Sequence, residues 1–167
     1  MSAVRILIVD EAEANILFFH VIMNDLGIKS VFTSTVPLAA LEIVKREKID
    51  FVITAWEMLS LPGTLFIQRA RGNRRTRRLP FLIYSKRLSA VDLRLTAELG
   101  MTNVLGMPFD KIKATELIKS LIQAESTLTK EEIKLRKMED LLAEVRPAEC
   151  LKFIGPDMTK KVPHLSR

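Results

Sequence analysis

Residues 5–11 read Arg-Ile-Leu-Ile-Val-Asp-Glu, a run of four aliphatic residues that ends in two carboxylates. Short apolar runs without polar alternation are typical of strands that are buried on both faces of a parallel sheet. Apolar residues at helical spacing follow from Ala12 to Leu26, and Gly27 is suited to end such a helix. This stretch therefore predicts a strand over 5–9 that leads directly into a helix, the repeating unit of α/β folds.

The same unit recurs along the chain. Strand-like runs occupy 30–34, 50–54, 81–84 and 102–105, and helix-like segments follow Pro37, Gly63, Ser89 and Asp110. Five strands that alternate with five helices imply right-handed crossovers and a sheet covered on both faces. We therefore predict an α/β fold with a doubly wound five-stranded parallel sheet in the flavodoxin-like order 2-1-3-4-5, followed by a C-terminal helical extension.

The segment after the last strand divides the chain into three expected regions. Residues 1–123 form the α/β domain, 124–147 a helical extension that Pro147 ends, and 148–167 a tail or linker. Leucines seven residues apart continue a heptad that starts at Ala114: Leu121, Leu128, Leu135 and Leu142. A continuous helix over 110–146 would form a parallel coiled-coil homodimer through these leucines. A break at Thr129, which with Glu132 makes a capping box, would instead give a separate helix that packs on the domain or on another chain.

Composition and charge narrow the classes of protein. The longest apolar runs are too short to span a bilayer and no targeting segment is apparent, so we expect a cytoplasmic protein without membrane contact. One cysteine excludes an intrachain disulfide, and one cysteine with two histidines does not predict a metal centre. The net charge of +6 permits several kinds of acidic partner, and we expect a signalling protein in preference to nucleic acid. No cofactor is expected.

Several short motifs stand in a fixed order along the predicted sheet. They are the Ile6–Glu11 run, the Trp56-x-Met58 turn that ends at Gly63, Leu79-Pro80, Gly100, and Pro108-Phe109. In this order and spacing, residues from about 5 to 123 resemble the receiver domain of two-component response regulators. The resemblance implies a phosphorylation mechanism. An aspartate after the third strand and two acidic residues after the first hold magnesium, and that aspartate accepts a phosphoryl group. A lysine after the fifth strand and a hydroxyl after the fourth bind the product.

The chain matches this pattern only in part. Asp10 and Glu11 match the acidic pair and Ser85 matches the hydroxyl, but Ala55 stands at the nucleophile position and Met107 at the lysine position. A methyl group can neither accept a phosphoryl group nor ligate magnesium. We therefore predict a degenerate, non-phosphorylatable receiver that is not an enzyme, with a remnant pocket formed by Asp10, Glu11, Ala55, Glu57, Ser85 and Met107.

Further departures support natural degeneration over a single engineered change at Ala55. Val104 stands at the position of the family's aromatic residue, and Leu59 and Pro62 replace its usual proline and aspartate in the turn before Gly63. The acidic pair can still hold a cation, or it can remain as a remnant that is solvated or paired with Lys86. We favour the second interpretation.

An arginine-rich segment offers a second candidate site. Six arginines lie between Arg69 and Arg78, and two pairs are four residues apart: Arg71 with Arg75, and Arg74 with Arg78. Guanidinium groups suit phosphate and carboxylate, and such pairs resemble arginine pairs that hold cyclic dinucleotides in other proteins. A solvated surface is the alternative interpretation. Two hypotheses follow: a signalling and dimerisation module that binds a protein partner, or a sensor of a small anion such as a cyclic dinucleotide.

Overall fold

The computed structural model describes residues 4–100 and 103–126. The chain divides into two compact units, 1–127 and 128–167, and every described residue belongs to the first. The elements follow in the order β1 (Arg5–Val9), α1 (Glu13–Asp25), β2 (Ser30–Ser34), α2 (Pro37–Arg46), β3 (Phe51–Ala55), α3 (Gly63–Ala70), β4 (Phe81–Ser85), α4 (Ala90–Glu98), β5 (Val104–Gly106) and α5 (Lys111–Ser126).

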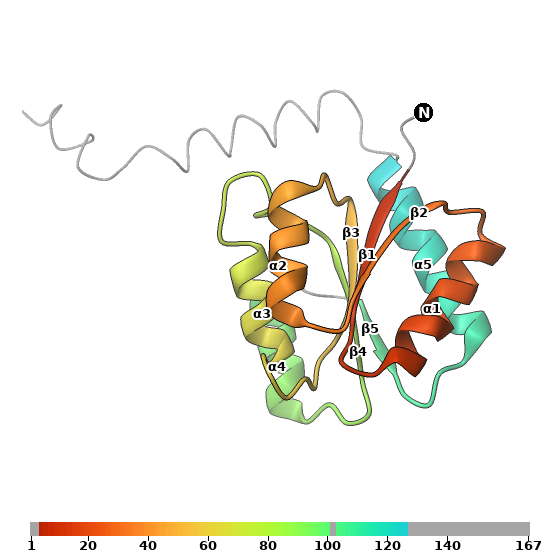
Figure 1. The fold of residues 1–167 in the computed structure, drawn as a ribbon. Coiled ribbons are helices and arrows are strands. Elements are labelled where there is room, and N and C mark those ends of the chain that lie inside the picture. Colours follow the sequence, from red (N-terminus) through yellow and green to blue (C-terminus); the bar gives the residue numbers. More distant parts are fainter. Residues whose placement is uncertain (1–3, 101–102, 127–167) are drawn as a thin grey trace, which may run out of the picture. The chain divides into compact units, whose positions relative to one another are not determined.

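The five strands form one parallel sheet in the order β2-β1-β3-β4-β5, as predicted. Helices α1 and α5 cover one face, and α2, α3 and α4 cover the other (Figure 1). The carboxyl ends of all strands therefore meet at one edge of the sheet, where α/β proteins of this type place their ligands.

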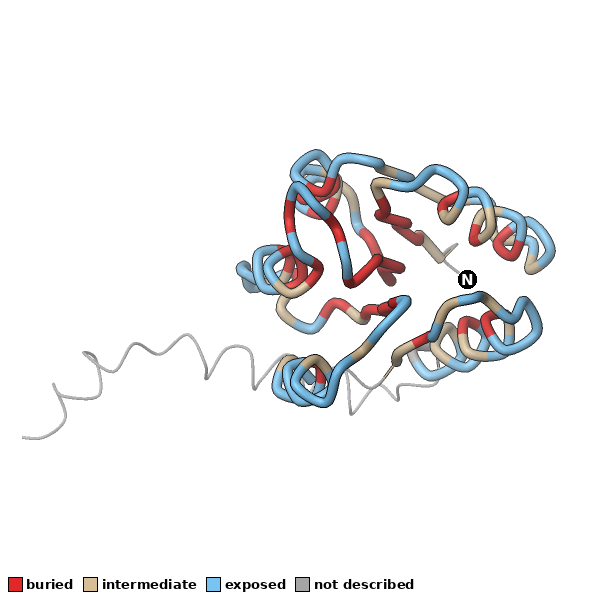
Figure 2. The backbone as a smooth tube through the Cα atoms, turned by 90° about the horizontal axis from the view of Figure 1, so that it is seen from below, coloured by how far each residue is buried: buried red, intermediate tan, exposed pale blue. Residues whose placement is uncertain are grey.

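The apolar strands form the centre of the core. Every residue of β3 and β4 is buried, and so are four of the five residues of β1 (Figure 2). The largest fully buried side chains include Phe19 from α1, Phe66 from α3, and Tyr84 from β4, so both layers of helices contribute to the core. Burial on both faces explains why these strands show continuous apolar runs.

Local signals at the helix ends are confirmed. Gly27 has a φ of +69°, and the Ile28 amide donates to the Met23 carbonyl at 2.9 Å, which closes α1 with a left-handed cap. Ser89 and Asp92 form a reciprocal capping box on α4. The Asp110 carboxylate accepts from the amides of Ile112 and Lys113, so Asp110 caps α5.

Three strands differ from the sequence prediction. The third covers Phe51–Ala55 instead of 50–54, the fourth ends at Ser85 instead of 84, and the fifth covers Val104–Gly106 instead of 102–105. Gly106 belongs to the strand because it pairs with Ser85 of β4. Register with a neighbouring strand sets this boundary, and composition alone does not reveal it.

The first positions of the predicted heptad belong to the core of the domain. Ala114 is fully buried, and Leu117 and Leu121 are half-buried and pack against the core cluster. Leu121 therefore packs against the core of its own domain, and its role in a dimer stays a prediction. The predicted leucines at 128, 135 and 142, and the alternative break at Thr129, lie outside the described residues.

Across 4–100 and 103–126, no helix is long and apolar enough to cross a membrane.

Candidate functional site

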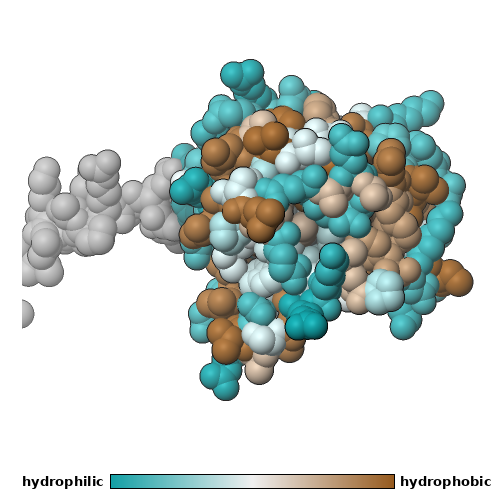
Figure 3. Space-filling view, turned by 60° about the horizontal axis from the view of Figure 1, so that its bottom comes forward, coloured by the Kyte–Doolittle hydropathy of each residue, from teal (hydrophilic) through white to brown (hydrophobic). Residues whose placement is uncertain are grey.

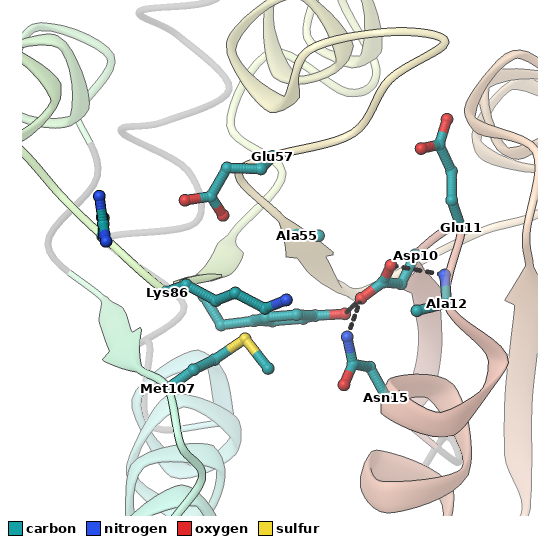
Figure 4. Close-up of a pocket in the computed structure, with 10 residues that line it drawn as sticks. Asp10, Glu11, Ala12, Asn15, Ala55, Glu57, Lys86 and Met107 are labelled. Atoms are coloured by element: carbon teal, nitrogen blue, oxygen red, sulfur yellow. Dashed lines mark hydrogen bonds between the residues drawn. The ribbon is translucent and has the colours of Figure 1, made fainter.

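A pocket opens at the carboxyl edge of the sheet (Figure 4). Figure 3 turns this end of the molecule toward the viewer, where polar and apolar residues are interspersed. The pocket has a volume of about 620 Å³ and is lined by Asp10, Glu11, Ala12, Asn15, Ala55, Glu57, Tyr84, Lys86, Arg87 and Met107. Five of the six residues predicted for the site line it. The sixth, Ser85, is hydrogen-bonded to Glu57.

Asp10 is a buried carboxylate that three protein groups hold in place. Its Oδ1 accepts from the Ala12 amide at 2.8 Å, and its Oδ2 accepts from Asn15 Nδ2 at 2.7 Å and from the Tyr84 hydroxyl. The residue is only 4% exposed. A buried carboxylate needs such donors because it has lost its hydration. Asp10 thus connects the end of β1 to the start of α1 and to β4.

Tyr84 is the main residue that the sequence reasoning missed. Burial, with the hydrogen bond to Asp10 and the charge of Asp10, raises the pKa of the Tyr84 phenol far above its usual value, so the hydroxyl remains a donor. Its ring packs against Phe19 and Phe109 at centroid distances of 5.0 and 5.2 Å. The aromatic side chain of the pocket therefore comes from β4 and not from the β5 position Val104. The signal in the sequence was the chain's single tyrosine, directly before Ser85.

Glu11 binds the loop between β3 and α3. Its Oε2 accepts from the Leu59 amide at 2.7 Å, and its Oε1 accepts from the Ser60 amide at 2.8 Å and the Ser60 hydroxyl at 2.5 Å. These donors, the Ser60 hydroxyl first, lower the pKa of the Glu11 carboxyl. Figure 4 shows Glu11 turned away from Asp10. Neither carboxylate pairs with Lys86 among the described residues, and both accept hydrogen bonds from protein donors instead.

The residues of the pocket do not fit a magnesium ion in this arrangement. Mg²⁺ requires oxygen ligands in near-octahedral geometry, and Ala55 offers no side-chain oxygen. All four carboxylate oxygens of Asp10 and Glu11 already accept hydrogen bonds from the protein. Within the described part of the chain, no group of three or more His, Cys, Asp or Glu side chains could hold a metal ion.

The positions of the expected nucleophile and lysine carry apolar side chains. Ala55 is 4% exposed at the end of β3, and Met107 is half-buried on the β5 side of the pocket. A positive charge enters instead from β4, because Lys86 extends into the pocket (Figure 4). At the start of α3, a Cβ on Gly63 would lie 2.7 Å from the Ala55 carbonyl oxygen, so only glycine lets α3 begin this close to β3.

Two hydrogen bonds connect the end of β3 to the segment that leads into α4. The Ser85 hydroxyl oxygen lies 2.5 Å from Glu57 Oε1 and 2.7 Å from the Arg87 carbonyl oxygen. One residue before Glu57, the Trp56 indole N–H donates to Asp92 Oδ1 at 3.2 Å. Asp92 also belongs to the capping box of α4, and the Ser89 hydroxyl and amide, then the Trp56 indole, lower its pKa. The N-terminus of α4 is therefore held to the residue that follows β3.

Two arginines of the arginine-rich segment bind backbone groups of the domain. The segment leaves the helix at Ala70 and continues through turns. Arg71 donates to the carbonyls of Leu79 and Leu99 and lies over the Phe81 ring, 5.3 Å from its centroid. Arg75 donates to the Lys45 carbonyl at the end of α2. Arg71 and Arg75 thus bind backbone groups of different elements, which does not support their interpretation as an anion-binding pair.

Comparison with known proteins gives one consistent family. Residues 6–119 match the response regulator receiver domain. The probable chemotaxis protein CheY of Rhizobium etli is 27% identical over 113 residues, which cover 66% of this chain and 88% of that protein. CheY-3 of Vibrio cholerae is 24% identical over 119 residues, covering 71% and 92%.

Solved structures agree in fold. A CheY-like receiver domain protein from Methanospirillum hungatei superimposes with a TM-score of 0.67 at 18% identity, covering 75% of this chain and 98% of that chain. The receiver domain of the sensor histidine kinase PA1611 from Pseudomonas aeruginosa, solved with magnesium coordinated in its active site cleft, gives 0.64 at 19%, covering 73% and 99%. With its sheet order and this match over most of its length, the chain belongs to the response regulator receiver domain family of two-component signalling.

Proposed function

We propose that this receiver domain signals by binding a protein partner and is not itself phosphorylated. One observation carries the proposal: the acidic pair that would hold a metal serves as a structural connection. Asp10 binds the start of α1 and Tyr84, and Glu11 binds the loop before α3. A magnesium ion would have to compete with these donors for the carboxylate oxygens.

The side chains at the two reactive positions support the same proposal. Ala55 has no oxygen to attack a phosphoryl group, and Met107 has no charge to stabilise the product. Lys86 cannot repair the first loss, because it supplies a charge and not a nucleophile for phosphoryl transfer.

The contacts between the pocket and α4 support activity without modification. Ser85 is hydrogen-bonded to Glu57, and Asp92 accepts a hydrogen bond from Trp56 of the same domain. Hydrogen bonds within the domain, and not a phosphoryl group, therefore determine the position of the start of α4. A partner that recognises this domain would meet the same surface at all times.

Acetyl phosphate provides the test. The full chain is incubated with acetyl phosphate and magnesium beside a CheY-type receiver as positive control, and both intact masses are recorded. We expect an adduct only on the control. An Ala55→Asp/Met107→Lys variant serves as a second comparison, because it restores both side chains while keeping the Tyr84–Asp10 contact. A stoichiometric phosphoryl adduct on the unmodified chain, lost at high pH, would contradict the proposal.

Dimerisation is a separate part of the proposed function and rests on the leucine heptad. The spacing of Leu128, Leu135 and Leu142 suits a parallel coiled coil that would make the domain a homodimer. Light scattering of the full chain and of a Leu135→Glu variant tests it. A dimer that the substitution converts to a monomer is expected, and a monomer in both cases would contradict it.

Sensing of a small anion is the second candidate, and Lys86 is the observation that favours it. Its side chain extends into the emptied pocket, and among the described residues it has no ion pair within 4.0 Å (Figure 4). Thermal-shift measurements with cyclic dinucleotides and with inorganic phosphate test this candidate. A rise in Tm that Lys86→Met abolishes would support it, and no rise with any of these anions would contradict it.

A further inference from the structure

A groove between α2 and α3 lies away from the pocket and combines apolar walls with positive charge. It has a volume of about 680 Å³ and is lined by Leu38, Ala39, Leu41, Glu42, Lys45 and Arg69. Helices α2 and α3 pack side by side on the same face of the sheet (Figure 1). The groove includes the first residue of the arginine-rich segment.

Exposed leucines lie on both helices beside this groove. Leu38 in the first turn of α2 is 53% exposed, and Leu65 on α3 is 42% exposed. Leu65 and Arg69 are four residues apart, so they lie on the same side of α3. Leu41, which also lines the groove, is buried. Leu38 therefore lines the groove from α2, and Leu65 lies on the side of α3 that carries Arg69.

The charged groups around the groove are mainly positive. Lys45 pairs with Glu42 at 2.6 Å, and this contact lowers the pKa of Glu42, the only acidic side chain in the lining. Arg69 is exposed, and the structure gives it no carboxylate within 4.0 Å in the described part of the chain. Arg75 reaches the end of α2 through the Lys45 carbonyl and adds a further cation nearby. Arg69 could therefore form an ion pair with a carboxylate of a partner.

The lining also distinguishes between classes of anionic partner. It contains no aromatic side chain, so the bases of a single-stranded nucleic acid would have no ring on which to stack. Leucine walls beside a guanidinium group instead suit a helix that carries leucine-like residues on one side and carboxylates at the border. Arginine is also well suited to bidentate contact with carboxylate.

We propose that the α2–α3 groove is the docking site for an acidic amphipathic helix of a partner protein. Apolar side chains of that helix pack on Leu38 and Leu65, and a carboxylate pairs with Arg69. This inference rests on the proposed function in one respect, namely that the domain acts by binding a protein. It adds the surface and the chemistry of the partner, and it gives the arginine at the start of the cluster a role.

The experiment uses the full chain and a fluorescein-labelled peptide with leucine and glutamate at helical spacing. The same peptide with lysine in place of glutamate, and a short single-stranded oligonucleotide, serve as competing probes. We expect the acidic peptide to bind more tightly than either, with an affinity that falls as salt increases. Amide chemical-shift changes should gather in α2 and α3. Arg69→Glu should weaken binding about tenfold, since a favourable charge contact becomes repulsive.

Matched variants on the opposite face of the sheet serve as controls. Lys113→Glu on α5 makes the same change of charge as Arg69→Glu, and Leu17→Ser on α1 matches Leu38→Ser. We expect Leu38→Ser to weaken binding and both controls to leave it unchanged. Equal effects of Arg69→Glu and Lys113→Glu, tighter binding of the oligonucleotide, or no binding of the acidic peptide would overturn the inference.

A repeat titration with acetyl phosphate and magnesium separates the two proposals. A phosphoryl adduct with unchanged peptide binding would contradict the proposed function and leave the groove intact. Without an adduct, peptide binding that does not respond to the groove variants would refute the groove and leave the proposed function standing.

Discussion

Replacement of Tyr84 by phenylalanine should measurably destabilise the domain although it removes a single oxygen. The ring would stay packed against Phe19 and Phe109, so little apolar burial is lost. What disappears is one of three donors to Asp10, a carboxylate only 4% exposed. Hydrogen bonds to charged groups contribute about 1.5–3 kcal/mol, and we expect the loss to lie in this range. The free energy of unfolding of a small domain is about 5–15 kcal/mol, so this loss would be a large fraction of it.

Urea unfolding followed by fluorescence provides the assay, because Trp56 is the chain's single tryptophan and is buried. With an m-value of about 1–3 kcal/mol/M, the midpoint should fall by roughly 1 M. A double-mutant cycle isolates the contact: in an Asp10→Ala background, Tyr84→Phe should cost less than about 0.5 kcal/mol. Ser120→Ala, which removes an exposed hydroxyl bound to the Leu117 carbonyl, is the control and should stay within about 0.5 kcal/mol.

Two results would refute this reasoning. The first is a Tyr84→Phe variant as stable as the unmodified chain, which would mean that the other donors satisfy Asp10 alone. The second is an equal cost of Tyr84→Phe with and without Asp10, which would place the effect in ring packing. Since burial raises the Tyr84 pKa, its absorbance should also show no ionisation at high pH before the domain unfolds.

Three further predictions concern the edges of the pocket. The pKa of Glu11 is lowered in the folded state, so its contribution to the free energy of unfolding is present above its unfolded pKa and is lost as pH falls through the folded value. Glu11→Gln should therefore destabilise the domain near neutral pH and much less near pH 3, as measured by urea unfolding at both pH values. Asp92→Ala and Ser89→Ala should both weaken the cap of α4, but only Asp92→Ala removes the partner of Trp56 and should shift its emission; equal shifts would contradict the contact. Ala55→Asp should lower stability by about 1–3 kcal/mol, because it adds a buried carboxylate near Asp10, while Ala55→Ser should cost less; equal midpoints in urea would contradict this.

Part of the fold and of the site follows from local pattern. Continuous apolar runs identified strands buried on both faces. Their alternation with helical spacing predicted a parallel sheet for which 2-1-3-4-5 was the leading order, and the structure confirms this order. Gly27 and the Ser89–Asp92 pair marked helix ends because caps depend on neighbouring backbone groups. Ala55 and Met107 were identified as substitutions because the resemblance to receiver domains gave the positions of the nucleophile and the lysine.

The partners of the remaining side chains required the tertiary structure. Tyr84 and Asp10 are 74 residues apart in the sequence. They meet because only β3 lies between β1 and β4 in the sheet, and the carboxyl ends of these strands share one edge. Arg71 looked like part of an anion site, yet its guanidinium group closes the turn at Leu79 and binds Leu99. Leu121 fits the heptad spacing, and only the structure shows that its side chain also packs against the core. Spacing along a chain determines which side chains share a face of one element. Which residues of another element pack against that face depends on strand register and on packing. Residues distant in the sequence contribute to both.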